Sequence, residues 1–352
     1  MDKQKSNAFM LKLVGDVSTA LAGALLVVGD RAGLFKAMAN AGALTPAALA
    51  ERSGIGERYV QEWLAVMAGA GYVEYDAELH SFTLPDEHAL FLADSESEYY
   101  LASLFQSLPT MAAAIPQLVD AFKHGGGVSF KDYGSELPRT LADMNRTVYE
   151  SRLVKTWMPF MPEVVQRLQA GGRALDVGCG MGVVPLALAR GFPAAHITGI
   201  DVDAHSIALA KARSAEIEDP QRLQYQQLGV EELPTDTGWD FISTFDVIHD
   251  LPDPVAALGH MRRALNQGGT YLMVEPKVAD DLKDNLANPF ARMLYGISCL
   301  HCVPQSLASG GLGLGACWGE KRARSLAAQA GFQHFERLDI RSPALAFYAL
   351  RA

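Results

Sequence analysis

From residue 173 onward, short apolar segments of strand length alternate with segments that have helical periodicity. Strands are predicted at 173–177, 196–200, 223–226, 239–244, 270–274 and 344–350. Helices are predicted after the first two strands, over 183–190 and 206–215. Strands that alternate with helices in this way form a parallel sheet with helices on both faces. The alternation therefore predicts an α/β domain built on a doubly wound sheet.

The first of these strands ends in a glycine-rich turn. Asp176 is followed by Gly178, Gly180 and Gly182, and Asp201 ends the second strand. Small residues let a ligand approach the backbone, and the helix after the turn points its amino end at the site. A carboxylate after the second strand can accept hydrogen bonds from the hydroxyls of a ribose. The two features together predict an adenosine-type ligand.

The spacing of the glycines and the nearby acid select among such ligands. Dinucleotide sites carry G-x-G-x-x-G against a pyrophosphate, whereas this chain has G-x-G-x-G directly after Asp176. A carboxylate there would repel a pyrophosphate but would suit an ammonium group. S-adenosylmethionine carries an ammonium, a sulfonium and a ribose and has no phosphate. The sequence therefore favours this cofactor over nicotinamide dinucleotides, and a methyltransferase over a dehydrogenase.

These motifs resemble those of class I S-adenosylmethionine-dependent methyltransferases over roughly residues 150–352. The matching segments are 175–182, 199–201, 240–249 and 265–269. The resemblance implies a Rossmann-like sheet whose glycine loop holds the methionine end of the cofactor, while the acid after the second strand holds the ribose. The cofactor-binding residues that it implies are Asp176, Gly178, Cys179, Gly180, Asp201, Val202, Gly229, Val230 and Phe245.

One position departs from the family pattern. An aspartate before a Leu-Pro step often binds the adenine amine in this family, and Val230 stands in its place here. Adenine recognition is then expected from the backbone of Val230, from apolar contact with Val202, or from Glu231.

The reacting centre is expected after the fourth strand, where His249 and Asp250 lie. Methyl transfer to a hydroxyl needs an oriented acceptor and removal of its proton, for which histidine is suited near neutral pH. The resemblance to plant-type O-methyltransferases implies that His249 is the base and that Glu275 or Asp250 orients its ring. The alternative is a structural histidine that packs the loop under the cofactor.

Tyr133, Tyr149 and Trp318 are the predicted substrate contacts. Trp318 stands where the plant-type O-methyltransferases carry an acid.

The N-terminal part has the pattern of a winged helix. A buried helix is predicted from the apolar residues between 11 and 26, helices at 46–54 and 56–70, and a hairpin of strands at 71–75 and 81–84. The second of these short helices offers only Arg58 as a cation, and the net charge of the chain is −10. DNA binding needs a basic surface, so a dimerisation or substrate-covering domain is predicted instead.

These features predict three parts: a mainly helical winged-helix domain at 1–94, a helical connector at 95–160 and a catalytic α/β domain at 161–352. Small-molecule O-methyltransferases of plants and of bacterial secondary metabolism have a similar order of parts, as does an uncharacterised mycobacterial-type group. That resemblance implies a homodimer acting on a small molecule, with no nucleic acid or membrane partner. The polar start of the chain and an apolar stretch of only 17–28 predict a cytoplasmic protein.

Several alternatives stay open at this point. A ligand-responsive winged-helix regulator and a relative that binds the cofactor without transferring methyl both fit the same motifs. Cys299, His301, Cys302 and Cys317 could bind zinc, but half of the usual cysteine set is missing. Core cysteines and no metal site are the prediction.

Overall fold

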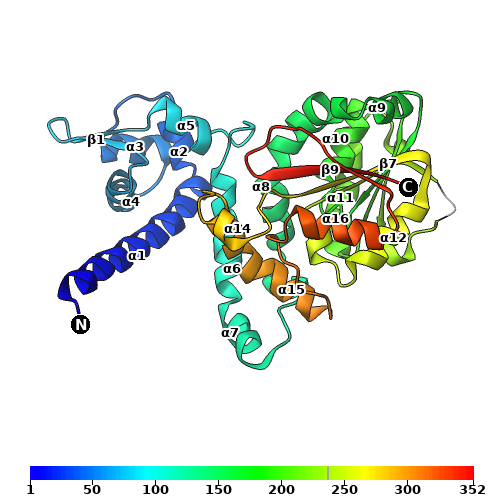
Figure 1. Cartoon of the computed structure of the whole chain (residues 1–352). Coiled ribbons are helices and arrows are strands. Elements are labelled where there is room, and N and C mark those ends of the chain that lie inside the picture. The colour runs from blue at the N-terminus through cyan, green and yellow to red at the C-terminus, as the bar shows by residue number, and fades with distance from the viewer. Residues whose placement is uncertain (236–237) are drawn as a thin grey trace. The chain divides into compact units, whose positions relative to one another are not determined.

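The computed structural model describes residues 1–235 and 238–352 (Figure 1). The chain divides by its internal contacts into two compact units, Met1–Pro109 and Thr110–Ala352. Residues 95–109 of the segment expected as a connector therefore cluster with the first unit, and residues 110–160 cluster with the second.

The first unit is a bundle of helices with a small hairpin. Its elements are α1 (Lys3–Arg31), α2 (Leu34–Met38), α3 (Pro46–Ser53), α4 (Glu57–Gly69), β1 (Glu74–Asp76), β2 (Ser81–Thr83), α5 (Asp86–Leu92) and η1 (Ala102–Ser107). Thr45 caps α3 by accepting a hydrogen bond from the Ala48 amide at 3.2 Å, and Gly54 ends that helix in the left-handed conformation. Val60, Leu64 and Met67 of α4 are buried. The predicted helix-turn-helix and hairpin are confirmed.

The prediction that the first helix is buried is wrong for most of its length. Buried residues of α1 are confined to its C-terminal half, where Leu26 packs into the core of this unit. Apolar side chains such as Val17 and Leu21 are about 60 % exposed in the first unit (60 % and 62 %). Helical spacing shows which residues share a face, but it does not show whether the same chain supplies the surface that covers the face. By length and composition alone, α1 is also long and apolar enough to cross a membrane, a property shared with core helices of ordinary globular proteins.

The second unit is built on one seven-stranded sheet. Its strands are β3 (Arg173–Val177), β4 (His196–Asp201), β5 (Leu223–Gln227), β6 (Trp239–Phe245), β7 (Leu265–Pro276), β8 (His334–Arg337) and β9 (Leu345–Arg351). Their spatial order is β5-β4-β3-β6-β7-β9-β8, and the first five in this order are parallel. β9 is antiparallel to both of its neighbours. The doubly wound sheet is confirmed, and β8 is an edge strand that the sequence did not predict.

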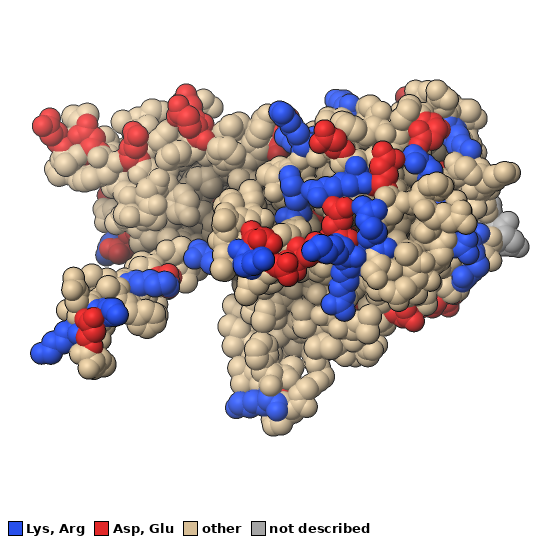
Figure 2. Space-filling model, in the orientation of Figure 1, with Lys and Arg blue, Asp and Glu red and all other residues tan. Residues whose placement is uncertain are grey.

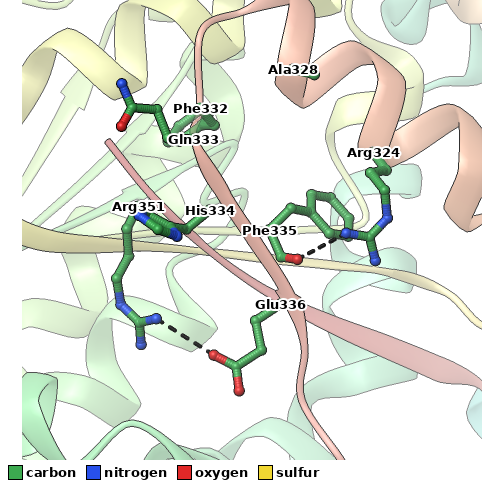
Figure 3. Close-up of a pocket in the computed structure, with 8 residues that line it drawn as sticks. All are labelled: Arg324, Ala328, Phe332, Gln333, His334, Phe335, Glu336 and Arg351. Atoms are coloured by element: carbon green, nitrogen blue, oxygen red, sulfur yellow. Dashed lines mark hydrogen bonds and ion pairs between the residues drawn. The ribbon is translucent and has the colours of Figure 1, made fainter.

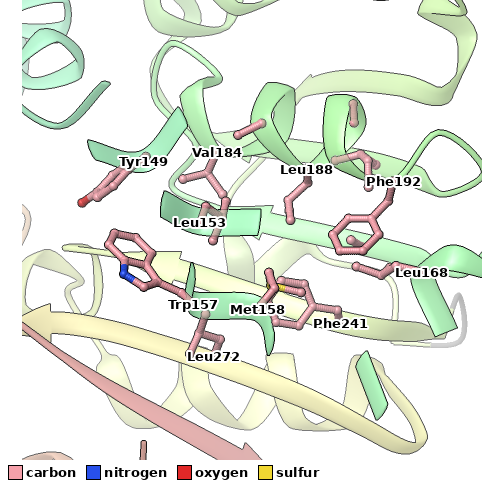
Figure 4. Packing of buried hydrophobic residues seen from close by; sticks show 14 of the residues in the cluster. Tyr149, Leu153, Trp157, Met158, Leu168, Val184, Leu188, Phe192, Phe241 and Leu272 are labelled. Carbon is pink, nitrogen blue, oxygen red and sulfur yellow. The ribbon is translucent and has the colours of Figure 1, made fainter. Parts of the chain in front are cut away.

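Helices cover both faces of this sheet. The helices that pack on it are α8 (Leu137–Arg152), α9 (Pro162–Gln169), α10 (Val183–Gly191), α11 (Ala204–Arg213), α12 (Pro254–Ala264) and α16 (Glu320–Gln329). The other helices from residue 108 onward are α6 (Leu108–Ala113), α7 (Ile115–His124), α13 (Leu282–Asn285), α14 (Ala291–Ile297) and α15 (Val303–Ala308). One core lies between the sheet and α8 to α11, and Trp157 and Leu153 fill its centre (Figure 4). The other core lies between the sheet and α12 and α16. The strand order reverses between β3 and β6, so the loops after these strands diverge and leave room for a ligand there.

Candidate active site

The glycine loop after β3 is held against the end of β4. The amides of Gly178 and Cys179 donate to the Ile200 carbonyl at 2.8 and 3.0 Å, and the Gly180 amide donates to Asp201 Oδ2 at 2.8 Å. Gly178 and Gly180 have φ angles of 69° and 50°, a region that side chains with a Cβ rarely adopt. The loop therefore needs glycine for its path, and Asp201 is joined directly to it. The structure thus places Asp201 next to the loop, and its predicted role at the ribose stays a prediction.

Asp176 lies under this loop and is almost completely buried. Its Oδ1 accepts a hydrogen bond from the Ser243 hydroxyl of β6 at 2.7 Å. Burial, together with the nearby Asp201 charge, raises the pKa of the Asp176 carboxyl to about 8, against the Ser243 hydrogen bond, which lowers it. Burial also raises the pKa of Asp201 and that of the Cys179 thiol. A cation in this loop would favour the ionised form of both carboxyls.

Two residues expected at the adenine differ in their exposure. The Val202 side chain follows Asp201 and is 69 % exposed, whereas Val230 is 6 % exposed and packs into the core beside α12. The amide of Gly229 donates to Glu232 Oε2 at 3.1 Å. Val202 thus offers an apolar surface to a ligand. Val230 is a core residue, and little of its side chain is accessible to a ligand.

A histidine and a glutamate form the centre of the second half of the site. His249 lies in η8 (Ile248–Asp250) and Glu275 lies near the end of β7. His249 Nδ1 is 2.5 Å from Glu275 Oε2, and both residues are buried. Glu275 also accepts hydrogen bonds from the Ile248 amide at 3.0 Å and from Trp318 Nε1 at 3.1 Å. Because an ionised carboxylate can only accept, His249 Nδ1 is the donor of this hydrogen bond, and in the neutral imidazole Nε2 carries the lone pair.

Charge around the ring determines its proton affinity. Burial lowers the pKa of His249, but the carboxylates of Glu275 and Asp250 outweigh burial and raise it well above the ordinary value. Asp250 Oδ1 lies 3.5 Å from His249 Nε2. Burial raises the pKa of Asp250 to about 6 while the His249 charge opposes that shift. The predicted grouping of His249, Asp250 and Glu275 is present.

The sequence prediction missed Asp246, although it stands in the same segment as His249. Asp246 has a φ of 56°, and its amide donates to the Val274 carbonyl at 2.9 Å. Its Oδ2 accepts a hydrogen bond from the Tyr149 hydroxyl at 3.2 Å, and burial raises its pKa to about 7. The Tyr149 ring packs on Phe245 with centroids 5.0 Å apart. The sequence signal that could have identified it is an acid at the end of the fourth strand, three residues before the predicted base; its strained conformation is visible only in the structure.

The three predicted substrate residues are all buried, in different surroundings. Tyr133 donates its hydroxyl to the Leu300 carbonyl at 2.6 Å, and its ring lies 5.0 Å from that of His301. Tyr149 meets Asp246 and Trp318 meets Glu275, as described above. Trp318 therefore positions the Glu275 carboxylate, which in turn positions His249. The prediction of Trp318 as a pocket wall did not include this contact.

The described surface depressions do not coincide with this region. The depression in Figure 3 lies between α16 and the edge strand β8, away from the glycine loop. Its two arginines are already paired, Arg324 with the Phe335 carbonyl and Arg351 with Glu336. The chemistry-bearing side chains gather instead at the carboxyl ends of β3, β4, β6 and β7.

Two family models match the chain. Residues 20–94 match an Rv2258c-like winged HTH domain, and residues 168–331 match a methyltransferase domain. In sequence order, the chain carries a winged-helix domain followed by a methyltransferase domain. The predicted family and fold are confirmed.

Similar proteins point to the same fold. A mitomycin 7-O-methyltransferase, MmcR, superposes with a TM-score of 0.70 at 20 % identity, over 99 % of this chain and 100 % of that one. Human N-acetylserotonin methyltransferase in complex with SAM gives 0.65 at 17 % identity, over 97 % of each chain. The ubiquinone biosynthesis O-methyltransferase of Aeromonas salmonicida is 33 % identical over 101 residues, which are 28 % of this chain. That match spans only 41 % of the curated relative.

We expect the pKa of His249 to be lower in the Glu275→Gln variant. Burial still disfavours the imidazolium, and one of the two carboxylates that stabilise it has been removed. Titration of the imidazole resonances by NMR measures the shift. Glu336→Gln, an exposed acid on β8, is the matched control and leaves the His249 titration unchanged. An unaltered His249 pKa in Glu275→Gln would contradict the proposed charge coupling.

Proposed function

We propose that the protein transfers a methyl group from S-adenosylmethionine to a hydroxyl oxygen of a small molecule. The observation that carries the proposal is the charge at one edge of the sheet. Asp176, Asp201, Asp246, Asp250 and Glu275 lie there, and among the described ion pairs the only cationic partner of any of them is His249. A cofactor with an ammonium and a sulfonium supplies positive charge at such an edge.

The glycine loop would hold the methionine end of the cofactor. A Cβ at Gly180 would meet no atom within 4 Å, so this glycine leaves room for a ligand at the backbone, whereas Gly178 lets Val247 pack closely on the loop. The buried carboxyl of Asp176 would face the ammonium. The Asp201 carboxylate accepts hydrogen bonds from the amides of Gly180 and Asp203 but retains lone pairs for the ribose hydroxyls. Exposed Val202 would contact the adenine.

His249 would remove the proton of the acceptor hydroxyl. The Glu275 hydrogen bond to Nδ1 fixes the ring and stabilises the imidazolium that forms when Nε2 takes the proton. The acceptor oxygen then forms its bond to the methyl carbon as the bond from carbon to sulfur breaks, and the sulfur leaves as a neutral thioether. Tyr133, Tyr149 and Trp318 would form the walls on the acceptor side.

We expect His249→Gln to lower kcat by about 10²- to 10⁴-fold, the usual contribution of a general base. Mass spectrometry of a metabolite extract incubated with methyl-labelled cofactor identifies the acceptor and gives the rate. Calorimetry with the cofactor should show unchanged affinity, because His249 is not among the proposed cofactor residues. Near-normal turnover would leave His249 as a structural residue.

The rate should also depend on pH in one direction. A histidine whose pKa is raised holds its proton at lower pH and cannot act as a base, so the wild-type rate rises as pH increases through that pKa. Glu275→Gln should shift this rise to lower pH.

The winged helix favours a role other than DNA binding. Arg58, the cation of α4, is paired with Glu62 one turn away. The face in Figure 2 shows basic side chains next to acidic ones instead of one continuous basic patch. Phosphate binding needs unpaired cations, so a transcriptional regulator is the less favoured function.

We also propose that the protein is a cytoplasmic homodimer that associates through its first helix. Met10, Val14, Val17, Leu21 and Val28 recur three, four or seven positions apart and are all exposed, so they form one apolar stripe along α1. A second copy of the same helix would bury this stripe.

The Val17→Glu/Leu21→Glu double variant should therefore be a monomer, because carboxylates in a buried helix interface are strongly unfavourable. Light scattering after size-exclusion chromatography measures the mass. Lys5→Glu, an exposed change on the same helix outside the stripe, should remain a dimer. A wild-type monomer, or a dimer in the double variant, would contradict the proposed interface.

A further inference from the structure

Three side chains beside the proposed base form a set of metal ligands. His249, Asp250 and Cys302 each offer one donor atom, and these atoms lie within 4.8 Å of one another. His249 and Asp250 lie together in η8, whereas Cys302 ends η9 (Ser298–Cys302), which is distant in sequence. His249 and Cys302 are buried, and Asp250 is half-buried. We call these three residues the mixed-ligand cluster.

The distance between His249 and Asp250 suits a small tetrahedral ion. Bonds from zinc to nitrogen, oxygen and sulfur of about 2.0 to 2.3 Å place tetrahedral ligand atoms about 3.3 to 3.8 Å apart. His249 Nε2 and Asp250 Oδ1 are 3.5 Å apart. Asp250 Oδ1 is buried and has no hydrogen-bond partner among the described residues. This oxygen is therefore available as a ligand beside the imidazole nitrogen.

The surroundings of His249 match those of a metal-bound histidine. Such histidines usually donate their second ring nitrogen to a carboxylate, which fixes the tautomer and turns the other lone pair to the metal. Here the Glu275 carboxylate accepts the hydrogen bond from His249 Nδ1, and Trp318 Nε1 and the Ile248 amide donate to Glu275 in turn. The support for Nε2 as a ligand is thus already in place.

The donor set selects the kind of ion. Magnesium and calcium prefer oxygen ligands alone, whereas an imidazole, a thiolate and a carboxylate together suit zinc and related divalent ions. Such an ion would displace the proton of the Cys302 thiol, since a coordinated cysteine is deprotonated. It would also supply positive charge beside Asp246 and Glu275, whose carboxylates face this region.

We propose that His249, Asp250 and Cys302 bind a divalent ion of the zinc class, with a fourth position open to a water molecule or another ligand. The inference goes beyond methyl transfer and does not require it. The ion and the acceptor proton would compete for Nε2, so the base described above would act only in the metal-free form. Zinc binding would thus be a means of controlling the reaction.

Cobalt(II) is the probe that tests the site, because a cobalt–thiolate bond gives a charge-transfer band in the near ultraviolet. Addition of Co²⁺ to the untagged full-length protein should produce this band, and Zn²⁺ should abolish it. Cys302→Ser should lose the band, and Asp250→Asn should bind Co²⁺ at least tenfold more weakly. Cys299→Ser, an exposed cysteine outside the cluster, is the matched control and should retain the band.

A wild-type protein without a Zn²⁺-sensitive band would overturn the proposal, as would a band that persists in Cys302→Ser. Asp250→Asn keeps all four cysteines, so weaker binding there reports the cluster even if Cys302→Ser folds poorly. Cofactor binding is measured separately by calorimetry on the same samples. If the protein binds S-adenosylmethionine but does not bind Co²⁺, only the proposed metal site is contradicted. If it binds Co²⁺ but does not bind S-adenosylmethionine, only the proposed methyl transfer is contradicted.

Discussion

The buried carboxylate of Glu275 is the constraint on which the catalytic half of the site depends. A buried ionised carboxylate is costly unless donors surround it, and this one accepts from the Ile248 amide, His249 Nδ1 and Trp318 Nε1. These three donors come from the loop after β6 and the segment before α16. The interaction therefore ties two distant segments to β7 and at the same time sets the orientation and charge of the imidazole.

The sheet topology explains why so many acids meet. Parallel strands end at the same edge, and the strand order reverses between β3 and β6. The loops after these strands therefore diverge next to Asp176, which lies near the end of β3, and Asp246, which follows β6. Burial raises the pKa of both residues, because ionising a buried carboxyl costs free energy when no cation is near. A cationic ligand relieves this cost. One edge of the fold thus accounts for the proposed preference for a sulfonium cofactor and for the proposed metal ion.

Local patterns were sufficient to predict the sheet, the glycine loop and the position of Asp201 at the end of β4. They work because strand alternation, positive φ and the position at a strand end are short-range properties. β8 was missed because a short, mostly exposed edge strand carries little apolar signal. The burial of α1 was wrongly predicted because an apolar stripe does not reveal which surface covers it. The proximity of Cys302 to His249 and the Trp318 hydrogen bond to Glu275 depend on tertiary packing of segments far apart in sequence, which no local pattern encodes.

Titration calorimetry of the wild-type chain with S-adenosylmethionine tests the central claim most directly. Saturable, stoichiometric binding is predicted, and Asp201→Ala should weaken it strongly, because the carboxylate is proposed to hold the ribose and is hydrogen-bonded to the glycine loop. No heat of binding in the folded wild-type protein, or equal affinity in Asp201→Ala, would contradict the proposed cofactor site.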